Sequence, residues 1–133
     1  MMKRRKSREL AFKLFYALEL SGDSRASVLE RFSAVTDPEE KDVKEYALSL
    51  FNWATEMTEE LNTVMPDIIS NWSMARVSKV DKSLIYLACA EIKKGGVPVN
   101  VVMNEYIELA KAFGDKDAPS FVNGVVDSWY KRA

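Results

Sequence analysis

The sequence contains no histidine and a single cysteine, Cys89, among its 133 residues. Without histidine, neither a Ser-His-Asp triad nor a Cys-His pair can form within the chain, and one cysteine cannot assemble a thiolate metal site. A single cysteine also excludes an internal disulfide, which suits a reducing compartment. These absences exclude most hydrolase chemistry and favour a cytoplasmic location.

Long apolar runs and nucleotide-binding loops are also missing. Charged residues interrupt every apolar stretch, so no segment approaches the roughly 20 apolar residues that a membrane span requires. No apolar signal core follows the basic amino terminus. The loops GxxxxGK(S/T) and GxGxxG are absent, and Glu105 with Glu108 lacks the histidine that would indicate a metal site. We therefore expect a soluble protein with no membrane contact, no cofactor and no metal.

Charge is distributed unevenly along the chain. Between Lys3 and Lys13 the sequence holds six basic residues and one acidic residue, so this segment carries +5 while the whole chain carries −1. An anionic polymer responds to local charge more than to the total, so such a segment is a candidate for phosphate contact. A solvated tail that aids solubility is the alternative. The charge pattern alone leaves both interpretations open.

Glycine and proline are scarce, at five and four residues, and they separate long segments whose apolar residues recur at helical spacing. This punctuation predicts an all-α fold with about seven helices. A seam near Met65-Pro66 predicts two helical subdomains, about 1–65 and 66–133, that share one core in a single domain. The predicted helices cover about 7–20, 26–35, 38–64, 68–72, 79–94, 98–113 and 117–129.

The third predicted helix has the strongest local start signal. Asp37 is a suitable N-cap, Pro38 fits the first helical turn, and Glu40 supplies the returning carboxylate of a capping box. The apolar spacing then continues without interruption to Pro66, which we expect to break or kink the helix.

Similar signals mark the later helices. Ser78 and Asp81 form a second capping box, and Asp117 can cap the last helix. Gly124, inside that last helix, costs about 1 kcal/mol relative to alanine, which predicts close packing against a neighbouring helix. Cys89 lies on an apolar helical stripe, so we expect a packed residue and not a nucleophile.

The first helix carries the most suggestive chemistry. Arg4, Arg5 and Arg8 can share one helical face with Phe12 and Tyr16. Guanidinium groups bind phosphates or stack on bases, and an exposed aromatic ring can stack on an unpaired base. The pattern therefore predicts a surface for single-stranded RNA, with burial of the aromatic residues in the core as the alternative.

Motifs along almost the whole chain, from about residue 4 to residue 129, resemble those of the NusB family of bacterial transcription antitermination factors. The segments with the most specific spacing are ELAK followed by FG, and FVNG. The matching residues are Arg4-Arg5-Lys6-Ser7-Arg8-Glu9, Leu14-Phe15-Tyr16, Trp72 to Arg76, Val80-Asp81, Val97-Pro98, Asn104-Glu105, Glu108-Leu109-Ala110-Lys111, Phe113-Gly114 and Phe121 to Asp127.

The resemblance implies an all-helical fold of two packed bundles without catalytic activity. NusB proteins bind the boxA element of nascent ribosomal RNA leaders together with NusE, which is also a protein of the small ribosomal subunit. The pair then joins RNA polymerase complexes that read through terminators. We therefore expect boxA-type RNA, NusE and the polymerase complex as partners.

Carried over by position, the resemblance also assigns residues. Those that match RNA-contacting positions are Arg4, Arg5, Arg8, Tyr16, Asp117 and Phe121. Asp81 matches a position in the region that faces NusE. Pro119 and Ser120 depart from the family pattern, so the RNA contact around the last helix is expected to be weaker or shifted.

Two other interpretations stay open. The same helical module forms the amino-terminal part of some ribosomal RNA cytosine methyltransferases, but this chain ends at Ala133 without a catalytic domain, so it would be an accessory module. A helical protein-protein interaction scaffold is the other. NusB relatives include monomers and homodimers, and a homodimer that covers the arginine-rich surface would suppress RNA binding until NusE competes.

Overall fold

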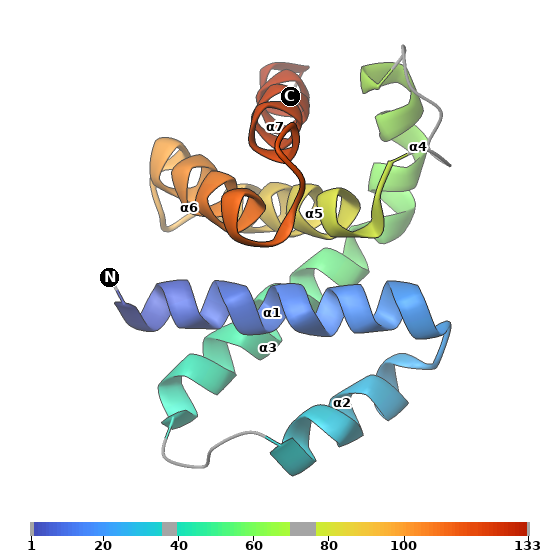
Figure 1. Cartoon of the computed structure of the whole chain (residues 1–133), viewed down its shortest axis with the longest axis vertical. Coiled ribbons are helices and arrows are strands. Elements are labelled where there is room, and N and C mark those ends of the chain that lie inside the picture. The colour runs from blue at the N-terminus through green and yellow to red at the C-terminus, as the bar shows by residue number, and fades with distance from the viewer. Residues whose placement is uncertain (1, 36–39, 70–76, 133) are drawn as a thin grey trace.

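The computed structural model describes residues 2–35, 40–69 and 77–132, and within these ranges it contains seven α-helices and no strand (Figure 1). The prediction of an all-α fold with about seven helices is confirmed. The helices are α1 (Met2–Ser21), α2 (Arg25–Val35), α3 (Lys41–Glu56), α4 (Thr58–Ile68), α5 (Lys79–Lys94), α6 (Val99–Phe113) and α7 (Ala118–Arg132).

Helix α5 lies at the centre of the molecule. Figure 1 shows α1, α2 and α3 gathered on one side of it, with α6, α7 and α4 on the other. Every residue of α5 from Ser83 to Glu91 is buried, because α1, α3, α6 and α7 all pack against this helix. The two sides of the molecule therefore meet on a common helix.

The buried apolar side chains form one continuous cluster that draws on all seven helices. Phe15 of α1, Phe51 of α3, Tyr86 of α5 and Tyr106 of α6 are among the largest fully buried side chains. Complete burial of an apolar side chain of this size stabilises the fold by about 1.5–3 kcal/mol. Cys89 is also fully buried, and burial raises the pKa of its thiol, so it is a packed residue as predicted.

Helix α1 begins at Met2, five residues before the predicted start at Ser7. The predicted start was wrong: Ser7 lies within the helix, and its side chain is buried against α3. Its hydroxyl donates a hydrogen bond of 2.9 Å to the backbone carbonyl of Val43 in α3. The basic segment is therefore part of a helix packed against the body, which contradicts the interpretation of a frayed tail.

The predicted third helix is divided at Met57, and Pro66 lies inside α4 without breaking it. The chain continues nearly helically through the division, since the Met57 N–H donates to the Trp53 carbonyl at 3.1 Å. Pro66 is tolerated because it is exposed and α4 ends two residues later, at Ile68. The predicted cap at Asp37 and Pro38 lies outside the described residues.

Local signals placed most of the later helix ends correctly. Ser78 Oγ accepts a hydrogen bond of 3.0 Å from the Asp81 N–H and so caps α5, as predicted. Helix α5 ends at Gly95, whose φ of +76° lies in the left-handed region. Helix α6 begins after Pro98 and ends before Gly114.

Two predictions for the last helix were wrong. Asp115, and not Asp117, caps α7: its Oδ1 accepts from the backbone N–H groups of Asp117 at 2.9 Å and of Ala118 at 3.0 Å. Gly124 is exposed, and a Cβ built on it meets no atom within 4 Å in the described structure. No close packing explains this glycine.

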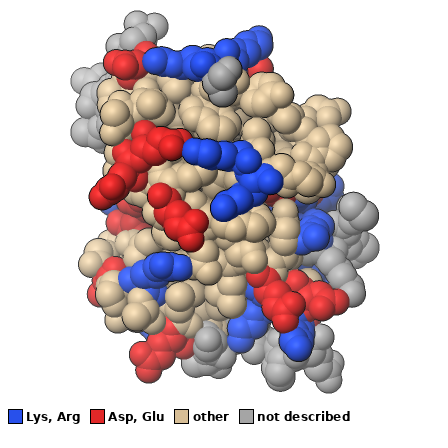
Figure 2. All heavy atoms as spheres, turned by 180° about the vertical axis from the view of Figure 1, so that it is seen from behind, with Lys and Arg blue, Asp and Glu red and all other residues tan. Residues whose placement is uncertain are grey.

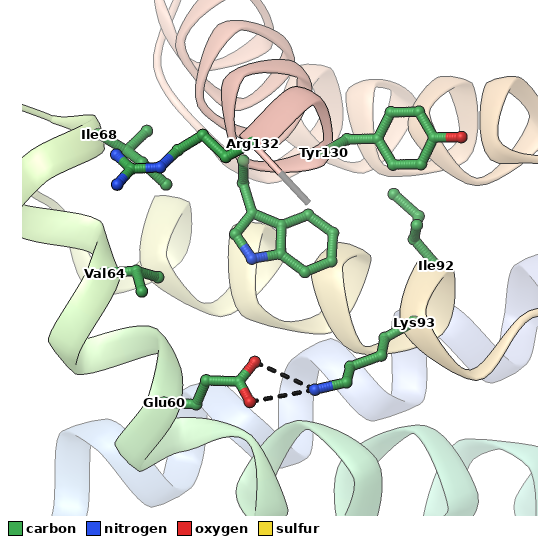
Figure 3. A pocket seen from close by; sticks show the side chains of 8 residues that line it. Glu60, Val64, Ile68, Ile92, Lys93, Tyr130 and Arg132 are labelled. Atoms are coloured by element: carbon green, nitrogen blue, oxygen red, sulfur yellow. Dashed lines mark hydrogen bonds and ion pairs between the residues drawn. The ribbon is translucent and has the colours of Figure 1, made fainter.

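A hollow of about 450 Å³ lies between α4, α5 and α7 (Figure 3). Hydrogen bonds of 3.0 and 3.2 Å from Lys93 to the Glu60 carboxylate close one side of it. The hollow lies beside the carboxyl-terminal ends of α5 and α7. Its lining residues are Glu60, Val64, Ile68, Ile92, Lys93, Trp129, Tyr130 and Arg132.

Within the described ranges, none of the helices is long and apolar enough to cross a membrane.

Candidate nucleic-acid interface

Helices α1 and α6 run side by side in the same direction (Figure 1). Arg5, near the amino-terminal end of α1, contacts Glu105 in the middle of α6, and Phe12 contacts Phe113 about two turns further along. This strip contains Arg5 and Tyr16, two of the predicted RNA-contacting residues of α1. We call it the α1–α6 seam and define it by Arg5, Phe12, Lys13, Tyr16, Glu105 and Phe113.

Arg5 lies at one end of the seam and is exposed, as predicted. Its Nε donates to Glu105 Oε1 at 3.1 Å and its Nη2 donates to Glu105 Oε2 at 2.9 Å. The hydrogen bond from Arg5 is the main reason that the pKa of Glu105 is lowered, so both partners are charged at neutral pH.

Arg4 is also exposed, but it faces α3 and not the seam. Its guanidinium carbon lies 3.4 Å from the centre of the Tyr46 ring, a cation–π contact. An open hollow of about 500 Å³ surrounds this contact. The other residues that line it are Asp42, Glu45 and Ser49.

The structure contradicts the assignment of Arg8 to an RNA-contacting face. Arg8 is only 3% exposed, and its Nε and Nη2 donate to the carboxylate of Glu91 at 3.0 and 2.6 Å. The hydroxyls of Tyr46 and Tyr106 donate to the same carboxylate, each at 3.0 Å. Burial and the charge of Glu91 raise the pKa of Tyr46 to about 12, so that hydroxyl stays a donor. Arg8 therefore orders the core beneath the surface.

Aromatic rings occupy the middle of the seam. Phe12 stacks on Tyr16 with ring centres 5.8 Å apart and contacts Phe113 at 5.1 Å. Phe12 is buried, contrary to the exposure considered for it, whereas Tyr16 is half-buried and Phe113 is 39% exposed. Lys13 Nζ lies 5.9 Å from the centre of the Phe113 ring. The seam therefore exposes two aromatic side chains beside a cation.

The loop between α6 and α7 lies at the far end of the seam. Asp117 is exposed, and its carboxylate makes no hydrogen bond within the described part of the chain. Phe121, one turn into α7, is half-buried against the core. Both predicted residues thus follow closely after Phe113 of the seam.

Asp81 is directed toward this loop and is half-buried. Its Oδ1 is buried without a hydrogen-bond partner in the described structure. Burial is the main cause that raises the pKa of Asp81, and the charge of Asp115 adds to it. Asp81 therefore lies in the first turn of α5, beneath the junction of α6 and α7.

Internal ion pairs balance much of the basic segment. Besides the pairs of Arg5 and Arg8, Lys6 contacts Glu40 at 3.0 Å and Lys13 contacts Glu9 at 3.2 Å. Figure 2 shows the side opposite to Figure 1, where basic and acidic patches alternate without one continuous area of either sign. The ion pairs of Arg5, Lys6 and Lys13 thus make the candidate interface a mixed surface and not a simple positive patch.

Sequence reasoning missed three residues that shape this region. Phe113 stands out in the sequence only as part of a matching motif, and nothing there indicates the partner of Glu105. Glu91 was overlooked, although its spacing of seven from Leu84 and three from Ala88 puts it on the buried face of α5. A charged residue at such a position signals a buried ion pair. Within the described ranges, no cluster of three or more acidic or cysteine side chains could hold a metal ion.

Comparisons with known proteins point to one family. The NusB family model matches residues 5–131 of the chain. The transcription antitermination protein NusB of Geobacter sulfurreducens is 34% identical over 125 residues, which cover 93% of this chain and 91% of the relative.

Two solved structures resemble the fold closely. The solution structure of NusB from Aquifex aeolicus has a TM-score of 0.83 and 27% identity, and the match covers 98% of this chain and 89% of that one. A crystal structure of the antitermination factors NusB and NusE in complex with double-stranded RNA contains a chain with a TM-score of 0.83 and 25% identity, covering 100% of this chain and 99% of that one.

Proposed function

The chain belongs to the NusB family, and from this premise we propose that it is a transcription antitermination protein that acts by binding and not by catalysis. The observation that carries the proposal is its full-length similarity to a chain from the complex of NusB, NusE and double-stranded RNA. The exposed arginines and aromatic rings near α1 and α6 agree with a role in RNA binding.

We propose that the RNA ligand is the boxA element of ribosomal RNA leader transcripts, bound together with NusE. The resulting complex joins RNA polymerase and promotes read-through of terminators. The resemblance of the sequence motifs to the NusB family supports these finer assignments.

In this proposal, Arg4 and Arg5 contact phosphates and Tyr16 stacks on an unpaired base. Phe113 extends the stacking surface, because its ring contacts the same Phe12 that Tyr16 stacks on. Arginine binds phosphate through two parallel N–H groups, and stacking on an aromatic ring tolerates any base. The seam thus supplies both kinds of contact within a few helical turns.

The far end of the surface has two further proposed contacts. The Asp117 carboxylate can accept hydrogen bonds from base amino groups or from a 2′-hydroxyl, since it is exposed and does not cap α7. Phe121 offers a partly exposed ring one turn later. We assign Asp81 to the NusE-facing region, where its place beneath the α6–α7 junction would set the shape of that junction.

Fluorescence anisotropy of a short labelled boxA-type RNA tests the proposal. The RNA is titrated with this protein alone and with NusE, at two salt concentrations, beside a scrambled RNA. We expect preferential binding to the boxA-type RNA that NusE strengthens. The affinity should fall with salt, with a log–log slope of about −0.7 per phosphate contact on single-stranded RNA.

Three single variants test the residue roles. Arg4→Gln and Arg5→Gln should each reduce the salt slope by about 0.7, because each removes one phosphate contact. Tyr16→Leu keeps apolar contact with Phe12 but removes the aromatic face, so it should weaken binding by about 1–3 kcal/mol. Lys131→Gln is the matched control, because Lys131 is exposed at the opposite end of α7 and pairs with Asp127.

The outcomes separate the interpretations. Equal binding to both RNAs would leave only a basic surface without sequence preference. No binding with or without NusE would contradict the RNA-binding function and favour a helical scaffold with a different partner.

A further inference from the structure

Glu105 lies between two arginines that differ strongly in exposure. Its side chain is 14% exposed, whereas that of its partner Arg5 is 63% exposed. Glu105 Oε1 also lies 3.5 Å from Nη1 of the buried Arg8. The carboxylate therefore stands between an exposed arginine of the proposed RNA surface and an arginine of the core.

The contact with Arg5 has the geometry of phosphate recognition. The Nε and Nη2 groups of Arg5 donate in parallel to the two oxygens of Glu105, at 3.1 and 2.9 Å. Arginine uses the same edge and the same pair of N–H groups to bind two oxygens of a phosphate. A phosphate that approaches this edge of Arg5 must therefore displace the carboxylate.

The exchange is energetically accessible because the two partners differ in burial. An ion pair with one highly exposed partner is weak, so Arg5 can leave at small cost. Glu105 is held in place by α6, and after Arg5 leaves it still faces the guanidinium of Arg8. The carboxylate is therefore not stranded without a positive neighbour.

We propose that Glu105 sets the RNA affinity of this protein by competing with phosphate for Arg5. RNA binding transfers the Arg5 guanidinium from the Glu105 carboxylate to a phosphate, while Arg8 keeps Glu105 in place. The inference rests on the proposed RNA-binding function and adds an internal competitor to it.

Glu105→Gln tests the competition, because glutamine keeps the size of the side chain but removes its charge. Glu108→Gln is the matched control: Glu108 lies one turn further along α6, is exposed, and pairs with Lys111 at 3.3 Å. Removal of either negative charge reduces the long-range electrostatic repulsion of RNA, so both variants should bind RNA somewhat more tightly. We expect Glu105→Gln to bind the boxA-type RNA about two- to fivefold more tightly than Glu108→Gln does, the factor that corresponds to a weak ion pair.

A double-mutant cycle with Arg5→Gln distinguishes competition from a general charge effect. If Glu105 acts through Arg5, the additional gain from Glu105→Gln disappears when Arg5 is already replaced. Thermal unfolding of each variant shows whether the contact with Arg8 is disturbed.

A measurement on the unmodified protein keeps the inference testable if Glu105→Gln does not fold. Nuclear magnetic resonance of 15N-arginine-labelled protein follows the Nε–H signals as RNA is added. We expect the Arg5 signal to shift on RNA binding and the Arg8 signal to stay nearly unchanged.

The results separate failure of this inference from failure of the function. If the unmodified protein binds no boxA-type RNA with or without NusE, the proposed function and the inference both fail. If it binds but Glu105→Gln equals Glu108→Gln, if the gain persists without Arg5, or if the Arg5 signal does not move, the competition is refuted and the function stands.

Discussion

The carboxylate of Glu91 joins four elements through hydrogen bonds. It lies in α5 and accepts from Arg8 of α1, Tyr46 of α3 and Tyr106 of α6. Desolvation of a charge is costly, and these donors together with the positive charge of Arg8 compensate for it. Loss of a single donor therefore affects the packing of several helices at once.

Arg8→Met is predicted to be strongly destabilising, because it leaves the Glu91 charge buried without its cation. Breaking one side of a buried ion pair costs about 3–5 kcal/mol, which urea unfolding measures directly. Lys13→Met is the comparison on the same helix, because Lys13 forms an exposed pair with Glu9 that is worth less than about 1 kcal/mol. Equal losses for the two variants would contradict a stabilising role of the Arg8–Glu91 pair.

The roles of the first arginines show what the sequence reveals about single residues. Arg4, Arg5 and Arg8 are chemically identical and close together, and the sequence correctly indicates a basic helical segment. Their fates differ because their partners, Tyr46, Glu105 and Glu91, lie between 42 and 100 residues away in the chain. No local pattern reports such distant neighbours.

Helix ends were predictable where the signal lies within a few residues of the end. Ser78 and Gly95 act on the adjacent turn, so both ends of α5 agree with the sequence. The division at Met57 carries no such signal, since the apolar spacing continues across it. The sequence predicted Asp117 as the cap of α7, but Asp115, two residues earlier, accepts the hydrogen bonds, and only backbone geometry distinguishes the two.

Gly114 and Gly124 differ in the space around them: Gly114 is closely packed, whereas Gly124 faces open space. Gly114 has a φ of −95°, which any residue adopts, so backbone conformation does not require glycine there. A Cβ at Gly114 would instead approach the Cβ of Ala118 to 2.4 Å and the carbonyl of Ala110 to 2.9 Å. The close contact between the end of α6 and the start of α7 depends on this missing side chain.

Substitution of each glycine by alanine should therefore have opposite effects on the free energy of unfolding. Gly114→Ala forces the α6–α7 junction apart and should destabilise the protein by about 1–3 kcal/mol. Gly124→Ala adds a side chain in open space within a helix and should stabilise it by about 0.5–1 kcal/mol. Urea unfolding of both variants measures the difference, and a shared sign would refute the assignment.

At the scale of the whole molecule, the basic residues at the start of the chain do not form a separate positive tail in the folded structure. Glu91 and Glu105 come from the carboxyl-terminal half of the chain, yet they neutralise arginines of the first ten residues. The sequence predicted the helical class, the exposed Arg5 and the exposed Asp117. It missed this neutralisation because charge along a chain does not describe charge in space.

The common core leads to a prediction about unfolding of the whole molecule. The sequence predicts helical subdomains of about 1–65 and 66–133, but α5 is buried against helices from both ranges, and Glu91 accepts hydrogen bonds from side chains of both. Because neither half can separate without exposing this shared core, we predict a single cooperative transition in urea. Variants that retain only Trp53 of α3 or only Trp129 of α7 report on each half by fluorescence. Their midpoints should coincide with each other and with far-ultraviolet circular dichroism, and separated midpoints would show that the halves unfold independently.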